Sequence, residues 1–116
     1  MVTEPVSLAL ARHIRWIENL PPGWHDLFCQ VAERLALEHP RVRITHAGQK
    51  LAMLQILTTA GDSNTHALIT QAWQASARTC EECGAGGRPL MDDSGWCRTL
   101  CPAHAGGFRV PPRRDR

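Results

Sequence analysis

Four residues near the C-terminal end of the chain have the types and the spacing of a metal site. Two residues separate Cys80 from Cys83, two separate Cys101 from His104, and seventeen lie between the pairs. Two thiolates at this spacing can bind one ion from a single tight turn, and a second short pair can complete a tetrahedron around it. The pattern predicts a zinc ion held by Cys80, Cys83, Cys101 and His104.

Cys97 offers an alternative fourth ligand. It lies four positions before Cys101, so a site of four cysteines, with Cys97 in place of His104, also fits the sequence. We favour His104 because its spacing from Cys101 repeats the reach of the first pair. Either set supplies four protein ligands, which is typical of structural zinc, whereas catalytic zinc keeps one position open. We therefore expect structural Zn²⁺ and no metal catalysis.

The segment that carries these ligands is rich in glycine and poor in apolar residues. Metal binding can supply the folding free energy that such a segment lacks. We expect residues 80–105 to form a zinc-binding module packed on the preceding core, and residues 106–116 to form a basic tail that contains proline. The arginines of this tail are candidate binding residues: Arg109, Arg113, Arg114 and Arg116.

The same segment resembles the C-terminal zinc module of a group of small uncharacterised bacterial and phage-type proteins. The shared pattern is Cys-x2-Cys-Gly, a loop with glycine, Gly-Trp, Thr-Leu-Cys and a His three residues later. Its residues here are Cys80, Cys83, Gly84, Gly95, Trp96, Thr99, Leu100, Cys101 and His104. The position of Cys97 varies in that pattern, so the resemblance implies His104 as the fourth ligand. It also implies a helix opened by Gly23-Trp24, then a strand pair and a helix that leads into the first cysteine.

Apolar residues at three- and four-residue spacing predict the helices that position this module. We expect helices over about 5–19, 24–38 and 64–78. The sequence Pro21-Pro22-Gly23 separates the first two, and Pro40 ends the second because the residue before proline avoids helical backbone angles.

A β-hairpin is expected between the second and third helices. Polar and apolar residues alternate over 41–46, and a short apolar run covers 51–58, with a turn at Ala47-Gly48-Gln49 between them. The predicted fold class is therefore α+β, with a helix–helix–hairpin–helix core over residues 1–79 and a C-terminal zinc knuckle. We expect Trp73 and Trp96 to pack between the knuckle and the helices.

Composition and charge argue against several classes of function. The chain has 116 residues, 43% of them hydrophobic, and a formal net charge of +2. That charge is small for a nucleic-acid-binding domain, and a chain with no Tyr and only 2 Phe lacks the aromatic residues of a base-stacking sheet. We find no secretory signal and no apolar run near the ~18 residues of a membrane span. A cytoplasmic location is expected, in the host cytoplasm if the chain is phage-encoded.

The motifs of several enzyme classes are missing. The sequence has no His-x-Glu with a downstream Pro-Cys-x2-Cys, no phosphate-binding glycine loop and no His-Glu-x2-His. His25 could activate Cys29, but that cysteine lies beside the apolar face of a predicted helix, where an inert thiol is favoured. We expect no enzyme but a zinc-stabilised module that docks on a larger protein or nucleoprotein complex. The resemblance to phage-type proteins implies a narrower role, as an inhibitor or adaptor of a host machine. The alternative prediction is a small nucleic-acid-binding zinc protein.

Overall fold

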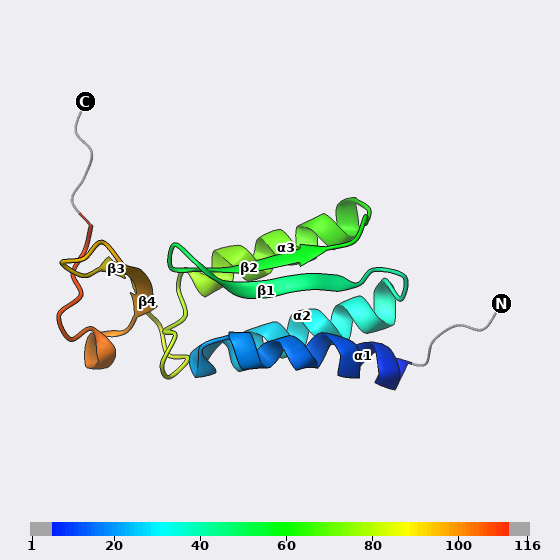
Figure 1. Ribbon diagram of the computed structural model, residues 1–116, viewed down its shortest axis with the longest axis horizontal. Coiled ribbons are helices and arrows are strands. Elements are labelled where there is room, and N and C mark those ends of the chain that lie inside the picture. The colour runs from blue at the N-terminus through cyan, green and yellow to red at the C-terminus, as the bar shows by residue number, and fades with distance from the viewer. Residues whose placement is uncertain (1–5, 112–116) are drawn as a thin grey trace, which may run out of the picture.

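The computed structural model describes residues 6–111, which form an α+β fold as predicted (Figure 1). The N-terminal helices are α1 (Val6–Ile14), the short 3-10 turns η1 (Arg15–Asn19) and η2 (Pro22–Trp24), and α2 (His25–Glu38). A first hairpin, β1 (Ile44–Lys50) and β2 (Met53–Thr58), is followed by α3 (Ser63–Ser76). The C-terminal part contains β3 (Arg88–Met91), β4 (Cys97–Leu100) and the turn η3 (Pro102–His104).

Each pair of strands within residues 6–111 forms its own antiparallel two-stranded sheet. Figure 1 shows the three helices and the β1–β2 hairpin side by side, and the β3–β4 hairpin at one end of that arrangement. The larger hydrophobic core lies between α2, α3 and the first hairpin, and Trp24, Phe28, Leu35 and Leu54 are its largest fully buried side chains. A second, small cluster around Leu90 and Leu100 belongs to the C-terminal part.

Local signals in the sequence explain the helix boundaries. The side chain of Asp62 caps α3 by accepting a 2.9 Å hydrogen bond from the Thr65 N–H, which satisfies one of the free donors at a helix start. The expected first helix is α-helical only to Ile14 and then tightens into η1. No helix in the described range has the length and apolar character that crossing a bilayer requires.

The turn of the first hairpin lies elsewhere than predicted. Strand β1 runs through Ala47-Gly48-Gln49, and the chain reverses at Leu51 and Ala52, whose φ angles are 51° and 69°. The predicted turn at Ala47-Gly48-Gln49 is wrong. The sequence predicts it at Gly48 because glycine favours turns, whereas non-glycine residues such as Leu51 and Ala52 rarely adopt positive φ. The reversal is held by a contact distant in sequence, because the Thr99 hydroxyl donates a 2.6 Å hydrogen bond to the Ala52 carbonyl.

The expected packing of Trp73 and Trp96 between knuckle and helices is wrong. Trp73 is 46% exposed beside β2, and Trp96 is 55% exposed with its ring edge-on to Phe108 and under the Arg98 guanidinium. Trp24, rather than Trp73 or Trp96, is the tryptophan that packs where the helices meet the C-terminal part. Its indole is fully buried, and its Nε1 donates a 2.8 Å hydrogen bond to the Thr79 carbonyl, just before the first cysteine.

Candidate metal centre

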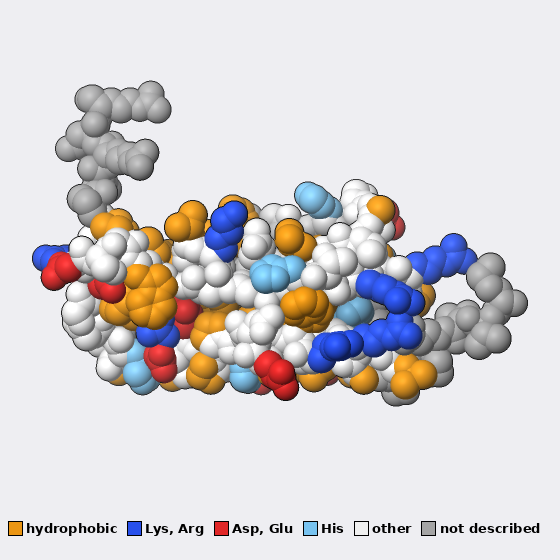
Figure 2. Space-filling model, in the orientation of Figure 1, with side chains coloured by type: hydrophobic (Ala, Val, Ile, Leu, Met, Phe, Trp, Pro, Cys, Tyr) orange, Lys and Arg blue, Asp and Glu red, His pale blue; other side chains and the backbone are white. Residues whose placement is uncertain are grey.

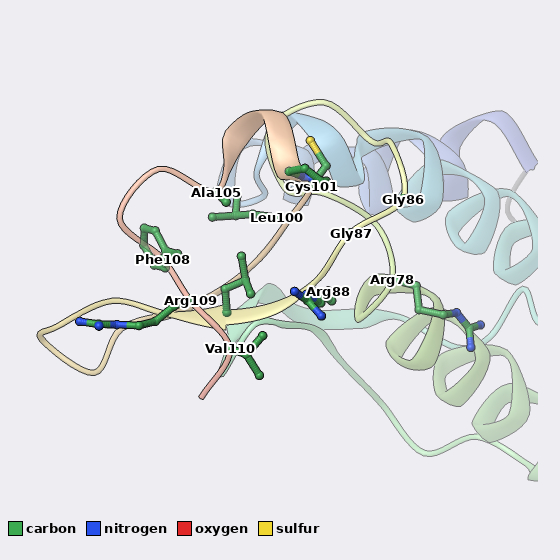
Figure 3. A pocket seen from close by; sticks show the side chains of 12 residues that line it. Arg78, Gly86, Gly87, Arg88, Leu100, Cys101, Ala105, Phe108, Arg109 and Val110 are labelled. Atoms are coloured by element: carbon green, nitrogen blue, oxygen red, sulfur yellow. The ribbon is translucent and has the colours of Figure 1, made fainter. Parts of the chain in front are cut away.

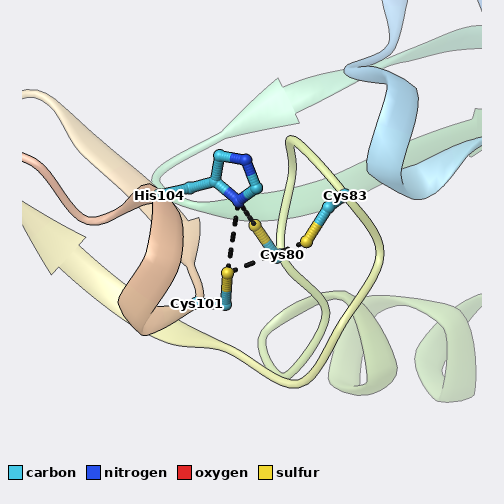
Figure 4. Close-up of side chains that lie close together, drawn as sticks. All are labelled: Cys80, Cys83, Cys101 and His104. Carbon is cyan, nitrogen blue, oxygen red and sulfur yellow. Dashed lines mark hydrogen bonds between the residues drawn. The ribbon is translucent and has the colours of Figure 1, made fainter.

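The first two predicted ligands lie in a tight turn directly after α3. The Gly84 N–H donates to the Cys80 carbonyl at 2.9 Å, and the Cys80 N–H donates to the Ala85 carbonyl at 2.7 Å. Gly84 has a φ of +80°, which glycine adopts without the steric cost that a Cβ would bring. This turn places Cys80 and Cys83 on the same side of the loop, facing Cys101 and His104 (Figure 4).

The other two ligands come from the end of β4 and from η3. Cys101 directly follows β4, and the His104 N–H donates to the Cys101 carbonyl at 3.0 Å, so one short turn presents both side chains. Figure 4 shows the His104 ring and the three thiols converging on one point from these two segments. The four side chains that the spacing predicted as ligands are thus brought together.

The separations match those around a tetrahedral zinc ion. With Zn–S bonds of about 2.3 Å and a Zn–N bond of about 2.0 Å, neighbouring ligand atoms of a tetrahedron lie roughly 3.5–3.8 Å apart. Here Cys83 Sγ lies 3.7 Å from Cys101 Sγ, and His104 Nδ1 lies 3.9 Å from Cys80 Sγ and 3.3 Å from Cys101 Sγ. All four ligand atoms lie within 4.8 Å of one another. The arrangement can therefore hold one metal ion through His104 Nδ1 and three sulfur atoms.

The surroundings of Cys101 favour its ligating form. The side-chain hydrogen bond with His104 lowers the pKa of the Cys101 thiol to about 6, against an opposing effect of desolvation. Metal ions bind the thiolate, so a thiol that loses its proton near neutral pH has a smaller cost of binding. Cys80 and Cys101 are buried, whereas Cys83 and His104 are exposed, which leaves the ion a path from solvent.

Cys97 lies outside this group. Its thiol is 3.7 Å from the Gly95 carbonyl at the start of β4, and it is not among the side chains that converge. Of the two ligand sets that the sequence allows, the geometry brings together the one with His104.

Two substitutions separate these sets. We expect Cys97→Ser to keep one zinc ion per chain with unchanged affinity, because its thiol is not a ligand. His104→Ala should weaken zinc binding by about 100-fold or more, because losing even an outer-shell partner costs 10–100-fold. Competition titration with a chromophoric chelator measures both. Equal losses in the two variants would contradict His104 as the ligand.

The turn of residues 80–84 is called the metal turn below, and a buried carboxylate between its two cysteines joins it to the rest of the molecule. Glu81 is 2% exposed, and its Oε2 accepts a 2.7 Å hydrogen bond from the Thr99 N–H of β4. Gln49 Nε2, at the end of β1, donates to the same oxygen at 3.2 Å and to the Cys97 carbonyl at 2.6 Å. Arg98 pairs with Glu81 as well, at 3.4 Å. One side chain thus joins the turn, β4 and the first hairpin.

The short turn η2, directly before α2, contacts the same junction from the other side. The Gly23 N–H donates a 2.7 Å hydrogen bond to the Glu81 carbonyl, next to the contact of Trp24 with Thr79. A Cβ on Gly23 would lie 1.9 Å from the Cys80 carbonyl oxygen, so only glycine allows this approach. The sequence predicts the Gly23-Trp24 pair only as a helix start. In the structure it is also the surface against which the metal turn packs.

Glu81→Gln should lower the free energy of unfolding by about 3 kcal/mol, because it breaks a buried ion pair and turns an amide N–H₂ toward other donors. The neighbouring Glu82→Gln is a matched control: its carboxylate also pairs with Arg98, but the side chain is 41% exposed. That change should cost less than about 1 kcal/mol. Denaturant unfolding of both zinc-loaded variants measures the difference, and equal losses would refute a special role for Glu81.

Within residues 6–111, the remaining candidate residues lie outside the group of four side chains. Arg109 pairs with Asp93 at the opposite end of the C-terminal hairpin, and Arg113, Arg114 and Arg116 lie outside the described residues. Cys29 is partly buried, and this burial, with the charges of Asp26 and Glu33, raises the pKa of its thiol and keeps it protonated. His25 contacts the Leu20 carbonyl through Nε2, at 3.1 Å.

Sequence reasoning missed Glu81, Gln49 and Thr99. A glutamate inside Cys-x2-Cys has the appearance of a solvated loop residue, and its exposed neighbour Glu82 is one. Nothing in the local sequence distinguishes the two, because the partners of the Glu81 carboxylate lie 17–32 residues away in the chain.

In comparisons with known proteins, no family model matches this chain, and neither the curated proteins nor the solved structures contain a significant match.

Proposed function

We propose that this chain is a non-enzymatic binding module, stabilised by structural zinc, that docks on a larger protein or nucleoprotein complex. The observation that carries the proposal is the convergence of three thiols and one imidazole within 4.8 Å. Four protein ligands fill the coordination sphere of zinc, so a substrate or a reactive water has no position on the ion. Thiolate-rich sets of this kind favour zinc over magnesium, calcium and manganese, which prefer oxygen ligands.

The position of the site supports a structural role for the ion. The four candidate ligands lie on or beside the turn that carries Glu81, and this turn contacts η2, the first hairpin and β4 through hydrogen bonds. A metal that stabilises such a junction contributes to folding free energy. The small cluster around Leu90 and Leu100 cannot supply much of that energy by itself.

Exposed apolar side chains support docking. Leu37, Leu51, Trp73 and Trp96 are between 46% and 74% exposed. Tryptophan is enriched among the residues that dominate the energy of protein interfaces. The narrower role of an inhibitor or adaptor of a host machine, encoded by a phage or mobile element and acting in the host cytoplasm, rests on the sequence resemblance.

The alternative, binding to nucleic acid, is favoured by one surface. Arg12, Arg15 and Arg43 line a hollow of about 470 Å³ that also contains Trp16, whose ring is edge-on to His46 at 5.8 Å. Figure 2 shows several Lys and Arg side chains close together at the end of the molecule where α1 and β1 begin in Figure 1. Arginines beside aromatic rings can bind phosphates and stack on bases.

Salt dependence distinguishes the two functions. The zinc-loaded chain, immobilised through an N-terminal tag, is used to capture partners from a lysate with and without nuclease, and the captured complex is then titrated with salt. Docking on protein predicts capture that survives nuclease and weakens little with salt. Nuclease-sensitive capture that falls steeply with salt would establish the alternative. The absence of any specific partner under both conditions would refute the proposal.

A further inference from the structure

A hollow of about 730 Å³ lies on the C-terminal part, next to the metal turn (Figure 3). Its size is within the ~300–1,000 Å³ of pockets that bind small molecules and side chains. Its apolar wall consists of Leu90, Leu100, Ala105, Phe108 and Val110. Val110 is 54% exposed at the mouth, while Leu90 and Leu100 are buried at the base. This arginine-rimmed hollow is distinct from the metal site, although Cys101 adjoins it.

The border of the hollow is positively charged. Arg78, Arg88 and Arg109 line it, and no Asp, Glu, Ser, Thr, Asn, Gln or His does. Figure 3 shows Arg109 and Arg88 on either side of Val110, with Arg78 farther off at the end of α3. Arg109 is paired with Asp93, whereas Arg78 and Arg88 have no ion-pair partner within residues 6–111. Arg88 and Leu90 are two residues apart on β3 and so share one face.

We propose that the arginine-rimmed hollow binds an acidic segment of a partner protein, which inserts one apolar side chain and places its carboxylates on Arg88 and Arg78. The inference rests on the proposed docking function and names its surface and the chemistry of its partner. An apolar anchor in a pocket with charged groups at its border is the usual anatomy of a protein interface. Arginine is the cation best suited to carboxylates, because its planar fork donates two parallel hydrogen bonds.

Charge complementarity favours an acidic occupant over the basic sequence that follows Pro111. The sequence after Pro111 contains Arg113, Arg114 and Arg116 against the single acid Asp115. A net positive segment is repelled by a border of arginines, and no acidic lining residue offsets that repulsion.

The lining also favours a protein side chain over a nucleobase. A base is recognised by hydrogen bonds to its edge or by stacking on an aromatic face. Apart from the arginines at its border and the Cys101 thiol, the hollow offers no side-chain hydrogen-bonding group, and Phe108, its one aromatic side chain, is edge-on to Trp96 at 5.8 Å. The mostly aliphatic wall is suited to Leu, Met or Phe.

The test uses the zinc-loaded full chain and fluorescein-labelled peptides rich in Asp and Glu, each with one central Leu, Met or Phe. Matched peptides have Ser at the centre, or Lys in place of the acids. Arg88→Glu and Val110→Asp alter the hollow, and Arg41→Glu is the control, because it makes the same charge change at an exposed residue elsewhere. Zinc content and the thermal midpoint verify that each variant is folded.

We expect the acidic peptides with an apolar centre to bind, and both matched sets to bind at least about tenfold more weakly. Arg88→Glu and Val110→Asp should each weaken binding about tenfold or more, and Arg41→Glu should leave it unchanged. No binding by any acidic peptide, or equal affinity of Arg88→Glu and the wild type, would overturn the inference. Tighter binding of oligothymidylate that depends on the same residues would assign the hollow to nucleic acid instead.

The two proposals can fail separately. The chain could capture a partner from a lysate with an affinity that Arg88→Glu does not change. That result would support the docking function and would show that the hollow is not the docking site.

Discussion

Replacing Cys83 by Ser should abolish stoichiometric zinc and lower the free energy of unfolding by about 4 kcal/mol or more. Loss of a metal is one of the few single-residue changes that reach this size. For a chain of 116 residues, that corresponds to a fall of roughly 16 °C in the thermal midpoint. Elemental analysis of the purified protein measures the zinc, and a thermal melt followed by circular dichroism measures the stability.

A chelator provides the control for this prediction. Excess chelator should lower the melting midpoint of the wild type to near that of Cys83→Ser, and should not change the variant further, because the metal is already absent. Acidification should also release the ion, since protons compete with zinc for the thiolates and the imidazole. Wild-type protein purified without zinc, and with the stability of the variant, would show that the four side chains are not a metal site.

Gly23→Ala should be nearly as damaging, although residue 23 is far from the cysteines in sequence. The added Cβ would lie 1.9 Å from the Cys80 carbonyl oxygen and 2.7 Å from backbone atoms of Glu81 and Gly84. Backbone atoms of this tight turn cannot move away cheaply, so η2 must separate from the turn. That separation breaks two hydrogen bonds, from Gly23 N–H to Glu81 and from the Trp24 indole to Thr79.

We expect a loss of about 3–5 kcal/mol for Gly23→Ala, since each buried group left without a partner costs about 1–3 kcal/mol. The melting midpoint should fall by roughly 12–20 °C. Gly86→Ala is the matched control: a Cβ there meets nothing within 4 Å and the φ angle is not positive. Zinc stoichiometry should remain one per chain in both variants, which separates damage to the junction from loss of a ligand. Similar midpoints for the two variants would refute the close approach of Gly23.

Local sequence patterns were sufficient for the helices and for the four metal-binding candidates. The expected helix over 24–38 differs from α2 by one residue, because Pro22 and Pro40 restrict the backbone at its two ends. The ligands were found because short Cys and His pairs each lie within one turn of backbone. Such a turn presents both side chains to the same point whatever the rest of the fold does.

Features that depend on contacts distant in sequence were not predictable in this way. The reversal at Leu51 and Ala52 is stabilised by Thr99, 47 residues further along the chain. Trp24 has the periodicity of an ordinary core residue, and only its indole contact with Thr79 shows that it supports the metal turn. Likewise, the burial of Glu81 follows from groups on β1 and β4 that only the folded chain brings together.

The order of these residues along the chain has a consequence for biosynthesis. Gly23, Trp24 and Gln49, which hydrogen-bond to residues 79–81, all precede Cys80, so the ribosome releases them before any of the four candidate ligands. An ion bound by all four candidate ligands can be captured only after these earlier residues have been synthesised. Leu100, which lines the arginine-rimmed hollow, is adjacent to Cys101, so a bound ion would also stabilise that part of the hollow. A partner that uses the hollow would therefore select chains that have matured in a cell with sufficient zinc.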